Sequence, residues 1–285
     1  MKKLYEKSEI SFAILWIVIY TVGIGTLNSS FGFNSPWPML GLIVICAAML
    51  LFVIKNGLTE KYGLSGWTRN GKAMLWLIPL WLISSINLFG GFTVKYPVAE
   101  LIYAAVSMAL VGYAEEQIFR GFLFKAMMKD GSVRTAVIVA SVTFALGHVV
   151  NLFSGQNLVD TLNQMFFAIA VGFVITMVFY KGGSLLPCIL AHSFIDVSSV
   201  FAPEDGPESL NVIVHVGVFV ISVAYCIYLV KRVETPAVNR VEARKPLITA
   251  ASECRRKEKM KRPDPCCGIR PFWHPRDDSN VRPHA

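Results

Sequence analysis

Charged residues are scarce in this chain. Of its 285 residues, 16% are Asp, Glu, Lys or Arg and 54% are hydrophobic, whereas a soluble domain carries roughly 25% charged residues. This scarcity excludes an ordinary soluble domain. The net charge of +8 does not indicate a nucleic-acid partner. Lys231–Ala285 contains 14 of the 27 basic and 7 of the 19 acidic residues. This segment therefore carries +7, and the rest of the chain carries +1.

Cysteine patterns, internal repeats and a cleavable leader are also lacking. None of the six cysteines has the spacing of a zinc or redox motif, and no segment recurs at a fixed period. The first apolar run, about Ser11–Leu27, is longer than the core of a typical signal peptide and is not followed by a small-residue cleavage pattern. We therefore interpret this run as a membrane span.

Long apolar runs are abundant, and each is close to the ~20 residues that a helix needs to cross a bilayer. The runs are about Ser11–Leu27, Pro38–Ile54, Ala73–Phe92, Leu101–Phe124, Thr135–Phe153, Thr161–Tyr180, Ser184–Phe201 and Asn211–Val230. They predict an all-α, polytopic membrane protein with about eight transmembrane helices in residues 1–232. Residues 233–285 are basic and aperiodic, so we expect a disordered C-terminal tail.

Basic residues in the connections predict the orientation of the spans, because Lys and Arg are retained on the cytoplasmic side. The segments 55–72, 125–134, 181 and 231–232 contain ten Lys or Arg residues, whereas Lys95 is the one basic residue in the opposite loops. We expect a multi-pass protein of the cell membrane with both termini in the cytoplasm and the lipid bilayer as its surroundings.

Ionisable residues inside three of the runs are the main functional signal, because such groups are costly in the bilayer and usually line a functional path. The fourth run contains Glu115, Glu116 and Arg120, the fifth contains Phe144 and His148, and the seventh contains His192 and Asp196. Residues four apart share a helix face. This spacing predicts a Glu116–Arg120 ion pair and places His192 beside Asp196, while Glu115 is left to point at another helix.

Three kinds of chemistry suit this set. A carboxylate with two imidazoles can activate a water molecule for hydrolysis. Glu115, His148 and His192 could instead hold a divalent metal such as zinc, or the set could relay protons. The structural alternatives are a buried ion pair for Glu116 and Arg120 and ordinary core packing for Phe144.

The three motifs, Glu-Glu-x-x-x-Arg, Phe-x-x-x-His and His-x-x-x-Asp, resemble those of the CAAX protease and bacteriocin-processing family of intramembrane endopeptidases, over about residues 75–230. This family includes CAAX prenyl endopeptidase-like and abortive-infection-like proteins. The resemblance implies that Glu115 activates water, that His148 polarises it, and that His192 and Asp196 stabilise the oxyanion. Glu116, Arg120 and Phe144 would support the site.

The resemblance leaves the metal and the substrate open. Asp196 stands where the family motif allows Asn or Asp, and an ionised Asp would oppose an oxyanion or favour a metal. The expected partner is a peptide or membrane-protein substrate, with bacteriocin maturation, self-immunity and turnover of a membrane peptide all compatible. The alternative is a non-catalytic membrane protein, either an immunity protein that acts by binding or a proton-coupled transporter.

Overall fold

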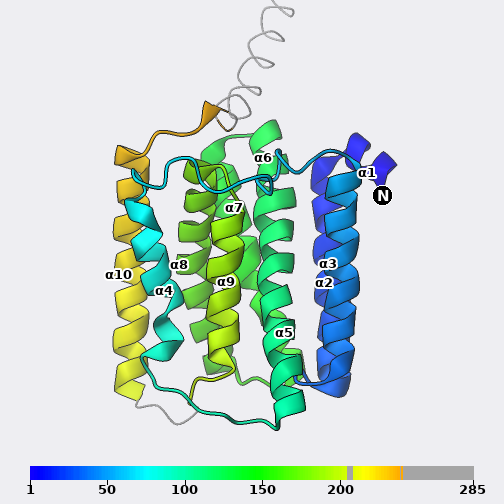
Figure 1. Ribbon diagram of the computed structural model, residues 1–285, viewed down its shortest axis with the longest axis vertical. Coiled ribbons are helices and arrows are strands. Elements are labelled where there is room, and N and C mark those ends of the chain that lie inside the picture. Colours follow the sequence, from blue (N-terminus) through cyan, green and yellow to red (C-terminus); the bar gives the residue numbers. More distant parts are fainter. Residues whose placement is uncertain (204–207, 238, 240–285) are drawn as a thin grey trace, which may run out of the picture. The chain divides into compact units, whose positions relative to one another are not determined.

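A computed structural model describes residues 1–203, 208–237 and 239, and these residues form helices and connecting segments without a strand (Figure 1). The longer helices are α2 (Glu9–Phe31), α3 (Pro36–Lys55), α5 (Val98–Glu115), α7 (Val133–Gly147), α8 (Leu158–Gly182), α9 (Leu186–Ser199) and α10 (Glu208–Arg232). The shorter ones are α1 (Lys2–Lys7), η1 (Leu75–Leu77), α4 (Ile78–Ser84), η2 (Ile86–Leu88), η3 (Glu116–Phe124), α6 (Lys125–Asp130) and η4 (His148–Ser154).

Six helices in the described part of the chain are long and apolar enough to cross a membrane. They confirm the all-α, polytopic fold, but the predicted count of eight is not confirmed. The third and seventh predicted runs form shorter apolar helices, Leu75–Ser84 and Leu186–Ser199. A helix of 14 residues is about 21 Å long, which is less than the ~30 Å hydrocarbon core.

The third predicted run, Ala73–Phe92, is not one continuous helix. Residues Leu75, Trp76 and Leu77 have positive φ angles of 54°, 52° and 63°, a region that side chains with a Cβ rarely adopt. Pro79 then begins α4, where its missing N–H costs no helical hydrogen bond. The irregular turns let short helices replace a straight span, and they bring Asn87 against α9, where it donates a hydrogen bond to the carbonyl of Ile195 at 2.7 Å.

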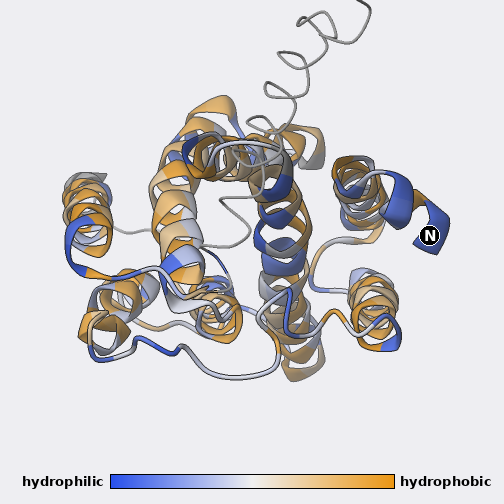
Figure 2. Cartoon of the chain, turned by 90° about the horizontal axis from the view of Figure 1, so that it is seen from above, coloured by the Kyte–Doolittle hydropathy of each residue, from blue (hydrophilic) through white to orange (hydrophobic). Residues whose placement is uncertain are grey.

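The outward sides of the helices are apolar. Large hydrophobic side chains such as Val22, Val44 and Val220 are 61%, 67% and 58% exposed, as expected of surfaces that face lipid. Hydrophilic residues gather instead in the connecting segments and in α1 at the N-terminus (Figure 2).

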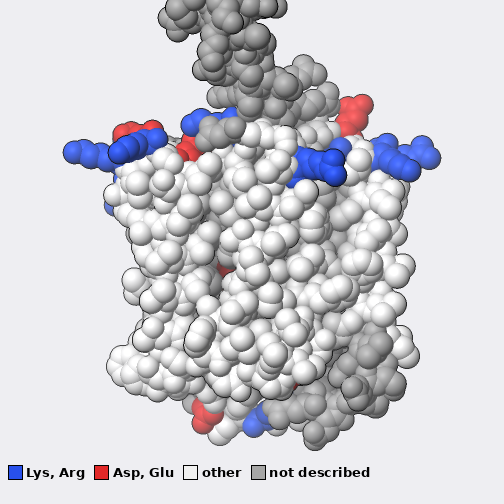
Figure 3. All heavy atoms as spheres, turned by 180° about the vertical axis from the view of Figure 1, so that it is seen from behind, with Lys and Arg blue, Asp and Glu red and all other residues white. Residues whose placement is uncertain are grey.

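The basic segments meet at one end of the bundle (Figure 3). Glu9 accepts hydrogen bonds from Lys61 at 2.5 Å and from Lys129 at 2.9 Å, so the N-terminus and the segments after α3 and after η3 lie together. Partial burial acts to lower the pKa of Lys61, but its hydrogen bonds and charge interactions with Glu9 and Tyr5 raise it above the usual value.

The opposite end is formed by the alternate connections. Asn34 donates to Glu100 at 2.6 Å, and the amide of Thr93 donates to the carbonyl of Phe201 at 2.8 Å. The predicted grouping of the loops by side therefore agrees with the fold. Glu204 and Asp205, which were also assigned to this end, lie outside the described residues.

The first residues after the predicted boundary at 232 pack on the helices. Lys181 donates to the carbonyl of Val233 at 2.7 Å, and Lys125 donates to Asn239 at 2.7 Å. These contacts tie α10 to α8 and α6. The expected tail from residue 240 onward lies outside the described residues, so its disorder stays a prediction.

Helices α5 and α9 cross closely at Gly112. A Cβ at this position would lie 2.5 Å from the amide nitrogen of Ser193 and 2.7 Å from its Cα, and Ser193 donates to the carbonyl of Ala109 at 2.9 Å. Small residues allow such close approach between membrane helices. This crossing sets the separation of α5, which ends at Glu115, and α9, which carries His192 and Asp196.

The orientation of the spans can be tested by cysteine accessibility. We expect a membrane-impermeant thiol reagent added to intact cells to label Asn157→Cys, and to label Ser65→Cys only after the cells are opened. The unmodified chain provides the background for its native cysteines. Labelling of Ser65→Cys in intact cells would reverse the orientation.

The close crossing predicts a large effect of a single methyl group. Gly112→Ala should destabilise the protein by about 1–3 kcal/mol, the usual cost of overpacking, because the backbone of Ser193 cannot move aside without displacing α9. Thermal unfolding in detergent measures this loss. Gly23→Ala is the matched control, since no atom lies within 4 Å of a Cβ there; equal melting temperatures for the two variants would contradict the prediction.

Candidate active site

A π-helix interrupts α5 directly after Glu115. The nine residues Glu116–Phe124 form η3, and all of their side chains are buried. Such wide turns are rare and often occur at functional sites. In a regular α-helix consecutive side chains diverge by about 100°, yet here both Glu115 and Glu116 reach the same imidazole of α9.

Glu116 is the central anion of the site. Its Oε1 atom accepts a hydrogen bond from Arg120 Nη1 at 2.9 Å and lies 2.8 Å from His192 Nδ1. Glu116 and Arg120 are fully buried. The predicted ion pair is therefore formed, and the same carboxylate also orients the histidine of another helix, with Nδ1–H donating to it and Nε2 directed away.

Arg120 is satisfied on every side. Its Nε donates to Thr176 Oγ1 at 3.3 Å, its Nη2 donates to the carbonyl of Gly172 at 3.3 Å, and its guanidinium lies 4.2 Å from the centroid of Phe144. A buried cation with this many partners connects η3 to α7 and α8. Phe144 is thus buried in the core and also borders the candidate residues.

Glu115 has one engaged and one unpaired oxygen. Tyr20 of α2 donates to its Oε1 at 2.7 Å. Its Oε2 is buried without a hydrogen-bond partner and lies 3.6 Å from His192 Nε2. Glu116 Oε2 is also buried without a hydrogen-bond partner, so access distinguishes the two carboxylates. The Glu115 side chain keeps 12% exposure and lines a cavity with Tyr20 and His148, whereas that of Glu116 is fully buried.

Asp196 faces the same imidazole from one turn further along α9. Its Oδ2 lies 3.5 Å from His192 Nε2 and is also buried without a hydrogen-bond partner. Two unpaired carboxylate oxygens therefore flank His192 Nε2. Buried polar atoms are normally paired, and one water or substrate group could satisfy both of these oxygens.

His148 completes the set at the point where α7 ends. Its ring and that of His192 each lie 5.4 Å from the Phe144 ring, in edge-to-face geometry. His148 and Phe144 line two small cavities: one of about 80 Å³ with Glu115 and Tyr20, and one of about 190 Å³ with His192 and Asp196. Residues of all three motifs, Arg120, His148 and His192, therefore gather around the Phe144 ring.

Several polar residues of the site carried no recognisable signal in the sequence. Tyr20 lies in the first apolar run, Thr176 in the sixth, and Asn87 in the run that proved to be broken. Each is a single polar residue in an apolar context, and only the packing of distant helices gives it a role. Asn87 and Gln164 line the cavity beside Asp196.

The residues present do not form a metal site of the expected kind. No group of three or more His, Cys, Asp or Glu side chains that could hold a metal occurs in residues 1–203 or the described part beyond them. His192 Nδ1 is engaged by Glu116, and its Nε2 is 3.6 Å from Glu115. In the described residues, Glu115, His148 and His192 are therefore not drawn together as a set of three ligands.

Comparison with known proteins identifies the central part of the chain. Residues 97–198 match the family model of Rce1-like, type II CAAX prenyl endopeptidases, a narrower range than the predicted 75–230. No curated protein and no solved structure matches the chain. The matched range runs from the start of α5 almost to the end of α9 and contains all seven candidate residues. The motifs and this match agree: residues 97–198 are similar to the Rce1-like family of CAAX endopeptidases.

Proposed function

We propose that this protein is an intramembrane endopeptidase that hydrolyses a peptide bond with water activated by Glu115. The observation that carries the proposal is the unpaired Oε2 of Glu115, which lies buried beside His192 and the cavities. A general base needs a free acceptor atom within reach of its water. Glu116 also has an unpaired Oε2, but its side chain is fully buried and paired with Arg120, whereas Glu115 lines a cavity that water can enter.

The reaction would use the remaining residues in distinct ways. A water between Glu115 and His148 would lose a proton to Glu115 Oε2 and add to the carbonyl carbon of the substrate. A doubly protonated His192, held at Nδ1 by Glu116, would donate Nε2–H to the resulting oxyanion, and a protonated Asp196 would donate to it as well. Glu115 would then return its proton to the leaving amine, so that one water is consumed for each bond broken.

The substrate would be a peptide or a membrane protein, because the candidate residues lie inside a bundle of membrane helices. The family match supports proteolysis but does not specify a sequence, and bacteriocin processing is one compatible role. No step of this proposal is assigned to a bound metal. The alternative is a protein that binds without cleaving, such as an immunity protein or a transporter. The experiments below distinguish it from the protease.

Replacing Glu115 separates chemistry from folding. Glu115→Gln keeps the shape of the side chain but removes the base, so proteolysis should fall by at least ~10²–10⁴-fold while the melting temperature changes little. Cleavage is measured by labelling new peptide N-termini in membranes of cells that express each variant. His148→Ala and His192→Ala should show the same loss.

Glu116→Gln is the contrasting variant. Its neutral amide leaves the buried Arg120 without a counter-charge, which should cost on the order of 3–5 kcal/mol, so the protein should melt earlier and lose activity together with its fold. Full proteolysis by folded Glu115→Gln would instead remove the hydrolytic proposal and favour binding or transport.

A further inference from the structure

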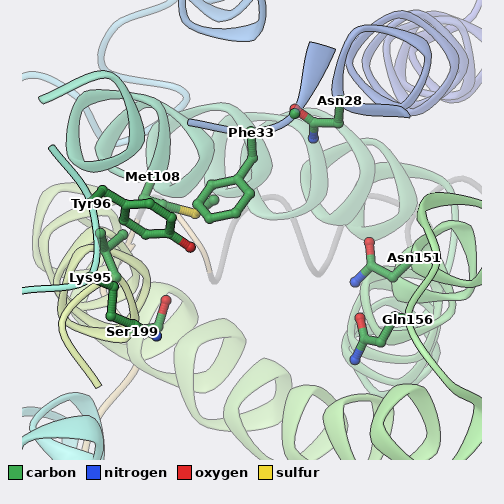
Figure 4. Close-up of a pocket in the computed structure, with 10 residues that line it drawn as sticks. Asn28, Phe33, Lys95, Tyr96, Met108, Asn151, Gln156 and Ser199 are labelled. Atoms are coloured by element: carbon green, nitrogen blue, oxygen red, sulfur yellow. The ribbon is translucent and has the colours of Figure 1, made fainter. Parts of the chain in front are cut away.

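A third and larger cavity lies at the end of the bundle opposite both the N-terminus and the last residues of α10. It measures about 410 Å³ and is lined by residues of the connections at that end, including Phe33, Tyr96 and Gln156 (Figure 4). It shares Asn28 and Asn151 with the cavity beside Glu115, and Ser199 with the cavity beside Asp196. The three cavities therefore adjoin one another.

The other end of the bundle is closed by packed aromatic rings. Phe12, Trp16 and Phe122 are buried, with ring centroids 5.0 Å apart for Phe12–Phe122 and 6.3 Å for Phe12–Trp16. These side chains lie between the site and the basic end of the bundle. A water or peptide approaching from that end would meet a close-packed core.

The large cavity has the polarity that a peptide backbone requires. The carboxamides of Asn151 and Gln156 lie side by side and point into it, and that of Asn28 lies across from them on α2 (Figure 4). Side-chain amides both donate and accept hydrogen bonds, as an extended backbone does. Phe33 and Tyr96 supply ring surface for apolar side chains.

We infer that this cavity is a vestibule that admits an extended segment of the substrate from the end opposite the N-terminus and the last residues of α10. The inference rests on the proposed function. It specifies the substrate class as a peptide whose scissile segment is presented at that membrane face, rather than at the face where the basic connections lie. With the predicted orientation, that face is the extracytoplasmic one.

Single cysteines test the vestibule. A small, charged, membrane-impermeant thiol reagent should label Ser199→Cys from the side on which Asn157→Cys is labelled. Prior attachment of a bulky maleimide to Gln156→Cys, in a Gln156→Cys/Ser199→Cys double variant, should slow that labelling at least tenfold. Labelling of Ser199→Cys only from the other side, or at an unchanged rate after the block, would overturn the inference.

Cleavage provides the second measurement. The maleimide on Gln156→Cys should reduce cleavage of a reporter peptide, built on the site cut most strongly in membranes, at least tenfold. The same maleimide on Asn157→Cys, one residue away but outside the lining, should leave cleavage unchanged. A labelled Gln156→Cys protein with full activity would refute the vestibule alone, whereas failure of the proposed function would appear as proteolysis that survives Glu115→Gln.

A separate observation concerns Tyr20, which lies outside the range matched by the family model. Its hydroxyl donates to Glu115 Oε1 at 2.7 Å, while the other oxygen of this carboxylate remains unpaired. A carboxylate held at one oxygen presents the second in a defined direction, and a charge-assisted bond of this kind is stronger than a neutral one.

We propose that Tyr20 is a positioning residue, which holds Glu115 so that Oε2 points at the reacting water. Helix α2 thereby contributes to a site whose other candidate residues all lie on later helices. The proposal rests on Glu115 acting as the base. Tyr20 takes no proton in the reaction and contacts the substrate only through Glu115.

Tyr20→Phe removes the hydroxyl and keeps the ring. We expect kcat for the reporter peptide to fall about tenfold or more, the effect of losing a hydrogen bond to a charged group, with KM changed by less than about twofold. Tyr113→Phe is the matched control and should retain full kcat, because the Tyr113 hydroxyl is buried without a hydrogen-bond partner. A fall in kcat that only follows a lower melting temperature, or an unchanged kcat, would overturn the role of Tyr20.

Discussion

The carboxylate of Glu116 is the constraint on which the rest of the site depends. A charge in the interior of a membrane protein is tolerated only with compensating partners, and Glu116 has two, Arg120 from its own helix and His192 from α9. Arg120 in turn reaches Thr176 and the backbone of α8. One buried anion therefore holds η3, α8 and α9 in a single arrangement, and loss of any partner would leave a charge uncompensated.

This arrangement divides two adjacent carboxylates into different tasks. Glu116 faces inward to its cation, so its position is set by electrostatics. Glu115 faces α2 and the cavities, with one oxygen held by Tyr20 and the other unpaired. The two carboxylates approach His192 from different sides, Glu116 at Nδ1 and Glu115 at Nε2. The close crossing of α5 and α9 at Gly112 places His192 within reach of both.

Hydrolysis within a membrane also requires that water and substrate reach the site from one side while the fold stays closed elsewhere. The aromatic cluster of Phe12, Trp16 and Phe122 provides the closure. In the inferred vestibule, the carboxamides around the larger cavity would provide a polar route at the opposite end. The interior is thus close-packed near the basic connections and hollow and polar at the other end. This difference comes from how the helices pack, because the outer sides of the helices are apolar at both ends.

Local sequence determined a good part of this protein. Long apolar runs and few charges were sufficient for an all-α membrane fold, because the bilayer requires internally hydrogen-bonded helices, and the i,i+4 spacing correctly paired Glu116 with Arg120 and His192 with Asp196. Tertiary structure decided the rest. Apolar content alone could not reveal that Ala73–Phe92 is broken, because a backbone reversal at Leu75–Leu77 depends on the packing of the short α4 against its neighbours. Spacing along one helix could not show that Tyr20 contacts Glu115, 95 positions away, or that Glu116 contacts His192, 76 positions away. Each of these contacts forms only because two different helices pack with these residues at the same height.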